Sequence, residues 1–243
     1  MQKIHNKNDL IILEKIQKIY DQNNIYITDN LIDDIDLVIK NNKNGQKKLI
    51  EILHTRLIIN NKDTTILDGL IFRKLIDTKI NYINLKLRDL FPNGIINSKF
   101  SSKIDYQTLQ NLLIDRKFQE ADKLTQTILC ELTPLNKNNK RKWLYFTDIP
   151  LIPSNELLLI DLIWRVYSNG KFGFSIQKRI WENQNHDWDK FLNIVGWVKD
   201  GTMRRYPKEF KWNLNAPKGH LPLLNQLRGV QVINYIFKHI AWL

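Results

Sequence analysis

Apolar side chains in residues 10–75 recur every three or four positions, the spacing that places them on one face of an α-helix. The stripes fall in four segments, which are 10–19, 31–38, 49–57 and 66–75. Joints rich in Asn, Gly and Asp separate them at 22–24, 41–45 and 60–63. The pattern predicts a helical bundle or stacked helical pairs. The many isoleucines also leave room for a strand or two, because Ile is a mediocre helix former.

A break in this periodicity predicts two domains. The stretch Pro92–Gly94 interrupts the apolar stripes, and a polar run follows at 98–102. Proline and glycine favour turns and end helices. We therefore expect an N-terminal helical bundle over residues 1–98 and a second domain over residues 99–243.

The second domain returns to helical spacing and then loses it. Its apolar stripes predict a helix after Asp105, which can cap it, and further helices from Phe118, after a cap at Ser154 or Asn155, from Phe174 and from Trp188. A last helix is predicted over 223–243. Residues 196–222 contain three glycines and three prolines, so no helix of normal length fits there. Long irregular segments in compact domains are usually functional. The expected fold class is all-α with long functional loops.

The charge of the chain restricts its partners without selecting one. The formal net charge is +12, and most of the excess lies after residue 100. A basic protein can meet nucleic acid, an anionic lipid surface or a small anionic ligand. No uncharged apolar run reaches the ~18 residues of a membrane span. The polar start of the chain predicts neither a secretory signal nor a cleaved transit peptide.

Catalytic and metal-binding patterns are missing from the sequence. It contains no Gly-rich phosphate loop, HExxH motif, serine elbow or paired-cysteine site. The single cysteine, Cys130, excludes an internal disulfide. The histidines form no ligand-spaced pair, and they are His5, His54, His186, His220 and His239. We therefore predict a protein that is not an enzyme, with no catalytic residues and no metal held by its own side chains.

Aromatic and basic residues are concentrated in one region. Residues 164–222 hold five of the seven tryptophans, with eleven Lys and Arg interleaved. Many of these rings will be core, but a small domain cannot bury every ring of a long loop. Two ligands suit flat aromatics beside cations: single-stranded nucleic acid, and a porphyrin with its carboxylates at one edge. Composition alone does not separate them.

Motifs in the second domain resemble those of a known family. They are IDYQTLQNLL at 104–113, FQEADKLT at 118–125, LLLIDLIW at 157–164, FGFSIQKRIW at 172–181 and NLNAPKGHLP at 213–222. Together they resemble the genomes-uncoupled family of tetrapyrrole-binding proteins, which activate magnesium chelatase. Ile, Lys and Asn, whose codons are A/T-rich, make up 88 of 243 residues. The chain is therefore similar to a plastid-encoded, red-algal-type member.

The resemblance implies a function and a setting. The all-helical second domain would be shaped like a cupped hand whose loops hold protoporphyrin IX or Mg-protoporphyrin IX as a ligand, with no tightly bound cofactor. Its partner would be the large, porphyrin-binding subunit of magnesium chelatase, which it would stimulate in chlorophyll biosynthesis. It would act as a monomer in the soluble stroma of the chloroplast, without nucleic acid, and peripheral contact with a membrane is compatible with this.

The resemblance also assigns the apolar part of the ligand site. Phe172 and Phe174 would support its aromatic wall. Trp197, Leu214 and Leu221 would contact the macrocycle.

The polar part of the site follows from the same motifs. Asn215 would lie near the metal face, which we prefer to His220 because a strong axial bond would hinder release. Lys218, where the family often has Arg, would face a propionate. Arg179 would either do the same or pair with Asp161.

Two other functions are compatible with the sequence. The aromatic and basic residues also suit a single-stranded nucleic-acid-binding module, whose affinity would fall steeply with salt. The N-terminal helices could instead act as a scaffold for other proteins.

Overall fold

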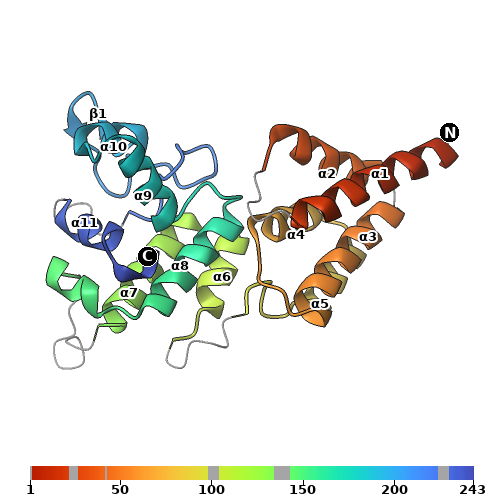
Figure 1. Cartoon of the computed structure of the whole chain (residues 1–243), viewed down its shortest axis with the longest axis horizontal. Helices are drawn as coiled ribbons and strands as arrows, with labels where there is room; N and C mark the ends of the chain where they lie inside the picture. The colour runs from red at the N-terminus through yellow and green to blue at the C-terminus, as the bar shows by residue number, and fades with distance from the viewer. Residues whose placement is uncertain (1, 22–26, 42, 98–103, 134–142, 224–229) are drawn as a thin grey trace. The chain divides into compact units, whose positions relative to one another are not determined.

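The computed structural model describes the chain except for residues 1, 22–26, 42, 98–103, 134–142 and 224–229, and it leaves out the side chains of residues 2–9 and 41. The described residues form two compact units, Met1–Asn97 and Ser98–Leu243 (Figure 1). The predicted joint at 22–24 and the predicted boundary run at 98–102 lie outside the described residues. Each unit is considered separately below.

The first unit is a helical bundle. Its elements are α1 (Gln2–Tyr20), α2 (Asp29–Asn41), α3 (Lys43–His54), a π-helical turn η1 (Thr55–Ile59), α4 (Ile66–Asp77) and α5 (Asn81–Leu90). The predicted stripes form its core, with Ile16, Ile35, Leu49 and Leu70 fully buried. None of its described residues lies in a strand, so the helical interpretation of this region is correct and the alternative of added strands is not.

A buried carboxylate links three elements of this unit. Asp68 in α4 is 0% exposed and forms a capping box with Thr65. It also accepts hydrogen bonds from Arg56 Nε and Nη2, both at 3.0 Å, and from the Tyr20 hydroxyl at 2.9 Å. The Arg56 guanidinium lies 4.1 Å from the centroid of the Tyr20 ring. One side chain of α4 is therefore bonded to α1 and to η1.

The second unit is also predominantly helical. Its elements are α6 (Gln107–Ile114), α7 (Phe118–Glu131), the 3₁₀ turn η3 (Phe146–Leu151), α8 (Ser154–Tyr167), α9 (Phe174–Asn183), α10 (Trp188–Ile194), the strands β1 (Val198–Lys199) and β2 (Thr202–Met203), α11 (Gln231–Phe237) and the 3₁₀ turn η5 (Ile240–Trp242). Phe118, Trp164 and Phe172 form its aromatic core, with ring centroids 5.6–6.5 Å apart. The all-α fold class is thus confirmed.

The first residues of α6 and α8 test the helix caps predicted from the sequence. The N-cap residue of α6 is Tyr106, without a side-chain cap bond, so Asp105 lies one position before the predicted cap; its carboxylate still accepts the backbone N–H of Gln107 at 2.8 Å. The cap of α8 was predicted wrongly. Its N-cap residue is Pro153, which is extended, and Ser154 is the first helical residue. Proline fixes its own φ, so the helix starts there without a side-chain cap.

The predicted last helix is shorter than expected, and a small hairpin was not foreseen. After α11, His239 is extended, its Nδ1 accepts the Ala241 N–H, and its Nε2 lies 3.0 Å from the Ile152 carbonyl oxygen. These bonds stop α11 before the end of the chain. The β1–β2 hairpin turns at Asp200–Gly201, where both residues have positive φ. Asp-Gly is a strong signal for such a turn.

Candidate functional site

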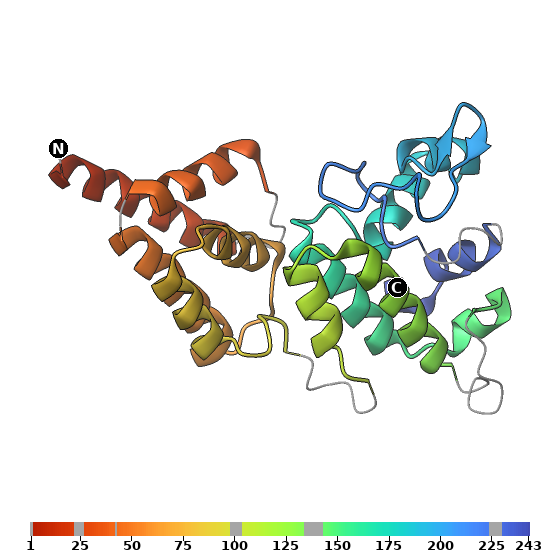
Figure 2. The same ribbon diagram turned by 180° about the vertical axis from the view of Figure 1, so that it is seen from behind.

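The long segment at 195–223 is held against the start of α9 by backbone hydrogen bonds. In Figures 1 and 2 it runs as a mostly irregular blue trace beside α9 and α10. Gly173 N–H donates to the Leu221 carbonyl at 3.1 Å, and Gly219 N–H donates to the Lys171 carbonyl at 2.9 Å. Lys171 Nζ donates to the Leu214 carbonyl at 2.6 Å. The motifs at 172–181 and 213–222 therefore form one structural site.

The buried side chain of Gln177 holds the C-terminal end of the segment at 195–223. This residue of α9 is 0% exposed, and its Nε2 donates to the carbonyl oxygens of Gly219 at 2.9 Å and Pro222 at 2.8 Å. Gly219 has φ +76°, and a Cβ there would lie 2.7 Å from Ile180 Cδ1 and 3.2 Å from Val195 Cγ1. Glycine is needed here for its backbone conformation and for close approach.

We expect Gly219→Ala to destabilise the second unit more than Gly201→Ala, by a further ~1–3 kcal/mol from overpacking. Both glycines have positive φ, but a Cβ at Gly201 would meet nothing within 4 Å. The Gly201 variant therefore carries only the backbone strain of about 1–2 kcal/mol. Urea unfolding followed by tryptophan fluorescence measures both. Equal losses would contradict close packing at Gly219.

Four of the predicted site residues lie in the interior. Phe172 and Phe174 are fully buried, which suits residues that support a wall. Trp197 is 1% exposed, donates from Nε1 to the His220 carbonyl at 2.8 Å, and meets the Phe191 ring edge-on at 5.8 Å. Leu221 is also buried. Because Trp197 and Leu221 offer no surface in this conformation, their contact with a macrocycle stays a prediction that requires the loop to open.

The other four predicted residues are accessible. Leu214 is half-buried, and Asn215, Lys218 and Arg179 are exposed. The alternative ion pair of Arg179 with Asp161 is wrong.

The Asp161 carboxylate already has other partners. It is buried and accepts the Ser175 N–H and hydroxyl, both at 2.8 Å, and Arg165 Nε at 2.7 Å. Asp161 therefore stabilises the start of α9, and the Arg179 guanidinium is left for solvent or a ligand.

His220 is held as a neutral ring inside the loop. It is 1% exposed, its Nδ1 lies 2.6 Å from the Val195 carbonyl oxygen, and its Nε2 accepts the Lys211 N–H at 3.2 Å. Burial lowers the pKa of His220, opposed by the bond to Val195 and reinforced by the charges of Arg204 and Lys211. Both ring nitrogens are therefore engaged, and neither is free to face a metal.

The charge of the loop favours an anionic ligand. Residues 196–222 contain six Lys and Arg against two Asp and Glu. Glu209 is engaged locally, since it accepts the Arg205 N–H at 2.7 Å. Lys208, Lys211 and Lys218 are exposed. The accessible loop surface is thus cationic.

Sequence reasoning missed Asp122, a buried carboxylate below the loop. Its Oδ1 accepts the Leu223 N–H at 2.7 Å. Burial raises the pKa of Asp122 to about 7, although the bond to Leu223 and the charge of Lys123 lower it. The pKa of Tyr206 is raised by burial and then by the charge of Asp122. The available signal was a carboxylate between the apolar positions of FQEADKLT.

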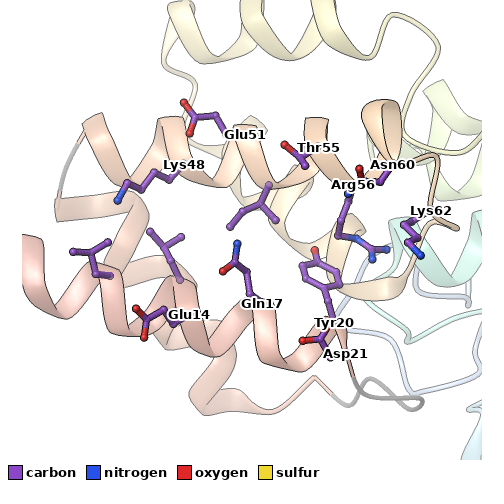
Figure 3. A pocket seen from close by; sticks show the side chains of 13 residues that line it. Glu14, Gln17, Tyr20, Asp21, Lys48, Glu51, Thr55, Arg56, Asn60 and Lys62 are labelled. Atoms are coloured by element: carbon purple, nitrogen blue, oxygen red, sulfur yellow. The ribbon is translucent and has the colours of Figure 1, made fainter.

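Other cavities lie outside this loop. A groove of about 900 Å³ runs between α1 and α3–η1 in the first unit. In Figure 3, Tyr20 and Arg56 lie toward one end of this groove, and Glu14 and Lys48 toward the other. A cavity of about 520 Å³ in the second unit is lined by Trp181, Phe237 and other side chains of α9 and the C-terminal turns.

Two kinds of feature are absent from the described residues. In the part of the chain that the structure describes, no three His, Cys, Asp or Glu side chains are grouped so as to hold a metal ion. Of the helices described there, none is both long enough and apolar enough to cross a membrane.

Comparison with known proteins identifies the family. The sequence model of the GUN4-like family matches residues 99–240. The ycf53 protein of Porphyra purpurea is 44% identical over 81% of this chain and 82% of its own length. The chloroplastic tetrapyrrole-binding protein of Arabidopsis thaliana is 34% identical over 56% of this chain and 55% of its own.

A solved structure agrees with these relatives. GUN4 from Chlamydomonas reinhardtii superposes with a TM-score of 0.54 at 38% identity, covering 59% of this chain and 93% of that one. The family model, over residues 99–240, includes both motifs that form the loop site. This chain belongs to the GUN4-like family.

Proposed function

We propose that this protein binds protoporphyrin IX and Mg-protoporphyrin IX with its second unit and stimulates magnesium chelatase in a plastid. The observation that carries the proposal is the loop site, in which a cationic, accessible surface covers an aromatic interior. The name of the Arabidopsis thaliana relative, a chloroplastic tetrapyrrole-binding protein, supports both the ligand class and the compartment.

The chemistry of a porphyrin fits the two parts of this site. Burying the macrocycle removes a large apolar area from water, at roughly 25 cal/mol per Å² before the costs of association. Its propionates stay at the rim, within reach of Lys218 and Arg179. Leu214 and Asn215 supply an accessible apolar contact and an amide contact. A lysine offers a point charge rather than the bidentate fork of arginine, so Lys218 holds its propionate less specifically.

A carrier must also release its ligand. Both ring nitrogens of His220 are engaged within the protein, so the metal face would meet the amide of Asn215 rather than an imidazole. Such a weak contact suits transfer to the large subunit of magnesium chelatase. The protein would act as a stromal monomer that delivers porphyrin and does no chemistry on it.

A titration of the protein with deuteroporphyrin, with and without Mg²⁺ in the ring, tests the proposal. We expect a shift of the Soret band and saturable quenching of tryptophan fluorescence. Adding the protein to a chelatase mixture should raise the rate of magnesium insertion, and the protein alone should insert none. Tight single-strand binding that weakens steeply with salt, without a Soret shift, would favour the nucleic-acid alternative.

Lys218 provides a test of where the carboxylates lie. Lys218→Ala should weaken porphyrin binding by about 0.5–1 kcal/mol, as expected for one exposed charge pair, and Lys218→Glu should weaken it more because it repels a dianion. Fluorescence-quenching titrations at two salt concentrations should show a smaller salt dependence for both variants. Lys40→Glu, an exposed change of equal charge on α2, is the control. If both Lys218 variants bind like the parent protein at low salt, the carboxylate end lies elsewhere.

A further inference from the structure

One hydrogen bond closes the loop site from the side of α7. Asp122 is 7% exposed, and its Oδ1 accepts the backbone N–H of Leu223 at 2.7 Å across 101 residues of sequence. Leu223 directly follows the motif at 213–222, in which Lys171 holds Leu214 near the start and Gln177 holds Pro222 next to Leu223. The bond therefore joins the end of the ligand loop to the helix beneath it.

The surroundings of Asp122 contain little to balance a charge. On its own helix the nearest influence is Lys123, which is exposed. From the loop it faces Tyr206, whose ring meets Trp212 edge-on at 5.8 Å. Among the residues that the structure describes, no cation forms an ion pair with Asp122. A carboxylate in such a place carries a desolvation cost unless water reaches it.

We infer that Asp122 is a positioning residue of the ligand loop, whose protonated form keeps the loop closed and whose ionised form favours its opening. The inference rests on the proposed function, since it assigns a residue that controls exchange at that site. Opening would uncover Trp197 and Leu221, the two predicted macrocycle contacts that are buried in the closed loop.

The direction follows from proton linkage. In the closed loop, burial raises the pKa of Asp122 to about 7. When the loop lifts and water reaches the carboxyl group, the pKa falls toward its ordinary value of about 4. The closed form thus holds the proton more tightly, so acid favours closure. Between pH 4 and pH 7 the equilibrium constant for opening the loop therefore rises by up to about tenfold for each pH unit. Above pH 7 this equilibrium constant stays level. The value of about 7 already includes the lowering of the pKa by the Leu223 N–H.

Stopped-flow measurement of deuteroporphyrin association and dissociation from pH 5.5 to 8.5 tests this inference in the full chain. Both rates should rise several-fold up to about pH 7 and then stay level. Asp122→Asn keeps the acceptor oxygen for Leu223 but cannot ionise, so its rates should stay at the low-pH level throughout. Asp115→Asn, which removes an exposed carboxylate between α6 and α7, should behave like the parent protein. Titration of the porphyrin itself would appear equally in all three proteins.

The same pH profile in the parent protein and in Asp122→Asn would overturn the inference. A second measurement does not need the variant or the ligand. Amide hydrogen exchange at Leu223, corrected for its intrinsic pH dependence, should lose protection as the pH rises toward 7. Constant protection would also overturn the inference. If no porphyrin binds at any pH, the proposed function fails, while the Leu223 amide still reports whether Asp122 controls the loop.

Discussion

Arg56→Met should destabilise the first unit by about 3–5 kcal/mol, because it leaves the buried carboxylate of Asp68 without its cation. Asp68 is 0% exposed and receives two hydrogen bonds from Arg56, both at 3.0 Å. The hydroxyl of Tyr20 remains as a donor but carries no charge. Urea unfolding followed by far-ultraviolet circular dichroism measures the loss, which should fall on the transition of the first unit and leave porphyrin binding unchanged.

Three further variants separate the ion pair from its surroundings. Tyr20→Phe removes one hydrogen bond and should cost about 0.5–1.5 kcal/mol. Arg56→Met combined with Asp68→Leu should recover part of the loss, because no unpaired charge remains, but not the capping box with Thr65. Arg88→Met on α5, an exposed position, is the matched control and should change stability by less than about 0.5 kcal/mol. A loss below 1 kcal/mol for Arg56→Met would show that water or a neighbouring group compensates Asp68.

The helices were predictable because their signals are local. The stripe at 31–38 contains Leu31, Ile35 and Val38, and all three are buried in α2. Spacing of this kind needs no knowledge of the partner helix. The hairpin at Asp200–Gly201 also has a local signal, because Asp-Gly favours the tight turn between two strands.

Long-range contacts determine which residues of the site are buried, and the spacing of residues in the sequence does not predict such contacts. Trp197 is buried by its bond to the carbonyl of His220, which lies 23 residues away, and by the Phe191 ring. From the sequence, a tryptophan in a Gly- and Pro-rich loop is expected to be exposed and to contact a ligand. The hydrogen bond from Trp197 to the His220 carbonyl, which buries the ring, is visible only in the structure. Asp122 and Leu223 are 101 residues apart. The motifs predict a region for the site, but only the fold separates its accessible residues from those that support them.

Trp197→Ala should destabilise the second unit by about 3–5 kcal/mol, the usual cost of truncating a buried tryptophan. It removes the packing against Phe191 and leaves the carbonyl oxygen of His220 without its donor at 2.8 Å. Trp197→Phe keeps much of the apolar volume and loses mainly the hydrogen bond, so it should cost less, about 1–3 kcal/mol. Thermal and urea unfolding of both variants, followed by circular dichroism, gives these values.

Porphyrin binding by the Trp197 variants then distinguishes a structural role from a ligand contact. At a temperature where circular dichroism shows Trp197→Ala to be folded, its porphyrin affinity should fall by more than that of Lys218→Ala, because apolar contact area and the support of the loop are both lost. The salt dependence of its affinity should equal that of the parent protein, since no charge has changed. Trp197→Phe should bind almost normally if the ring contacts the macrocycle in the open loop, because a phenyl ring replaces most of that surface. If Trp197→Ala folds and binds within twofold of the parent protein, the ring neither contacts the ligand nor holds the loop, and the aromatic wall must be formed by other side chains.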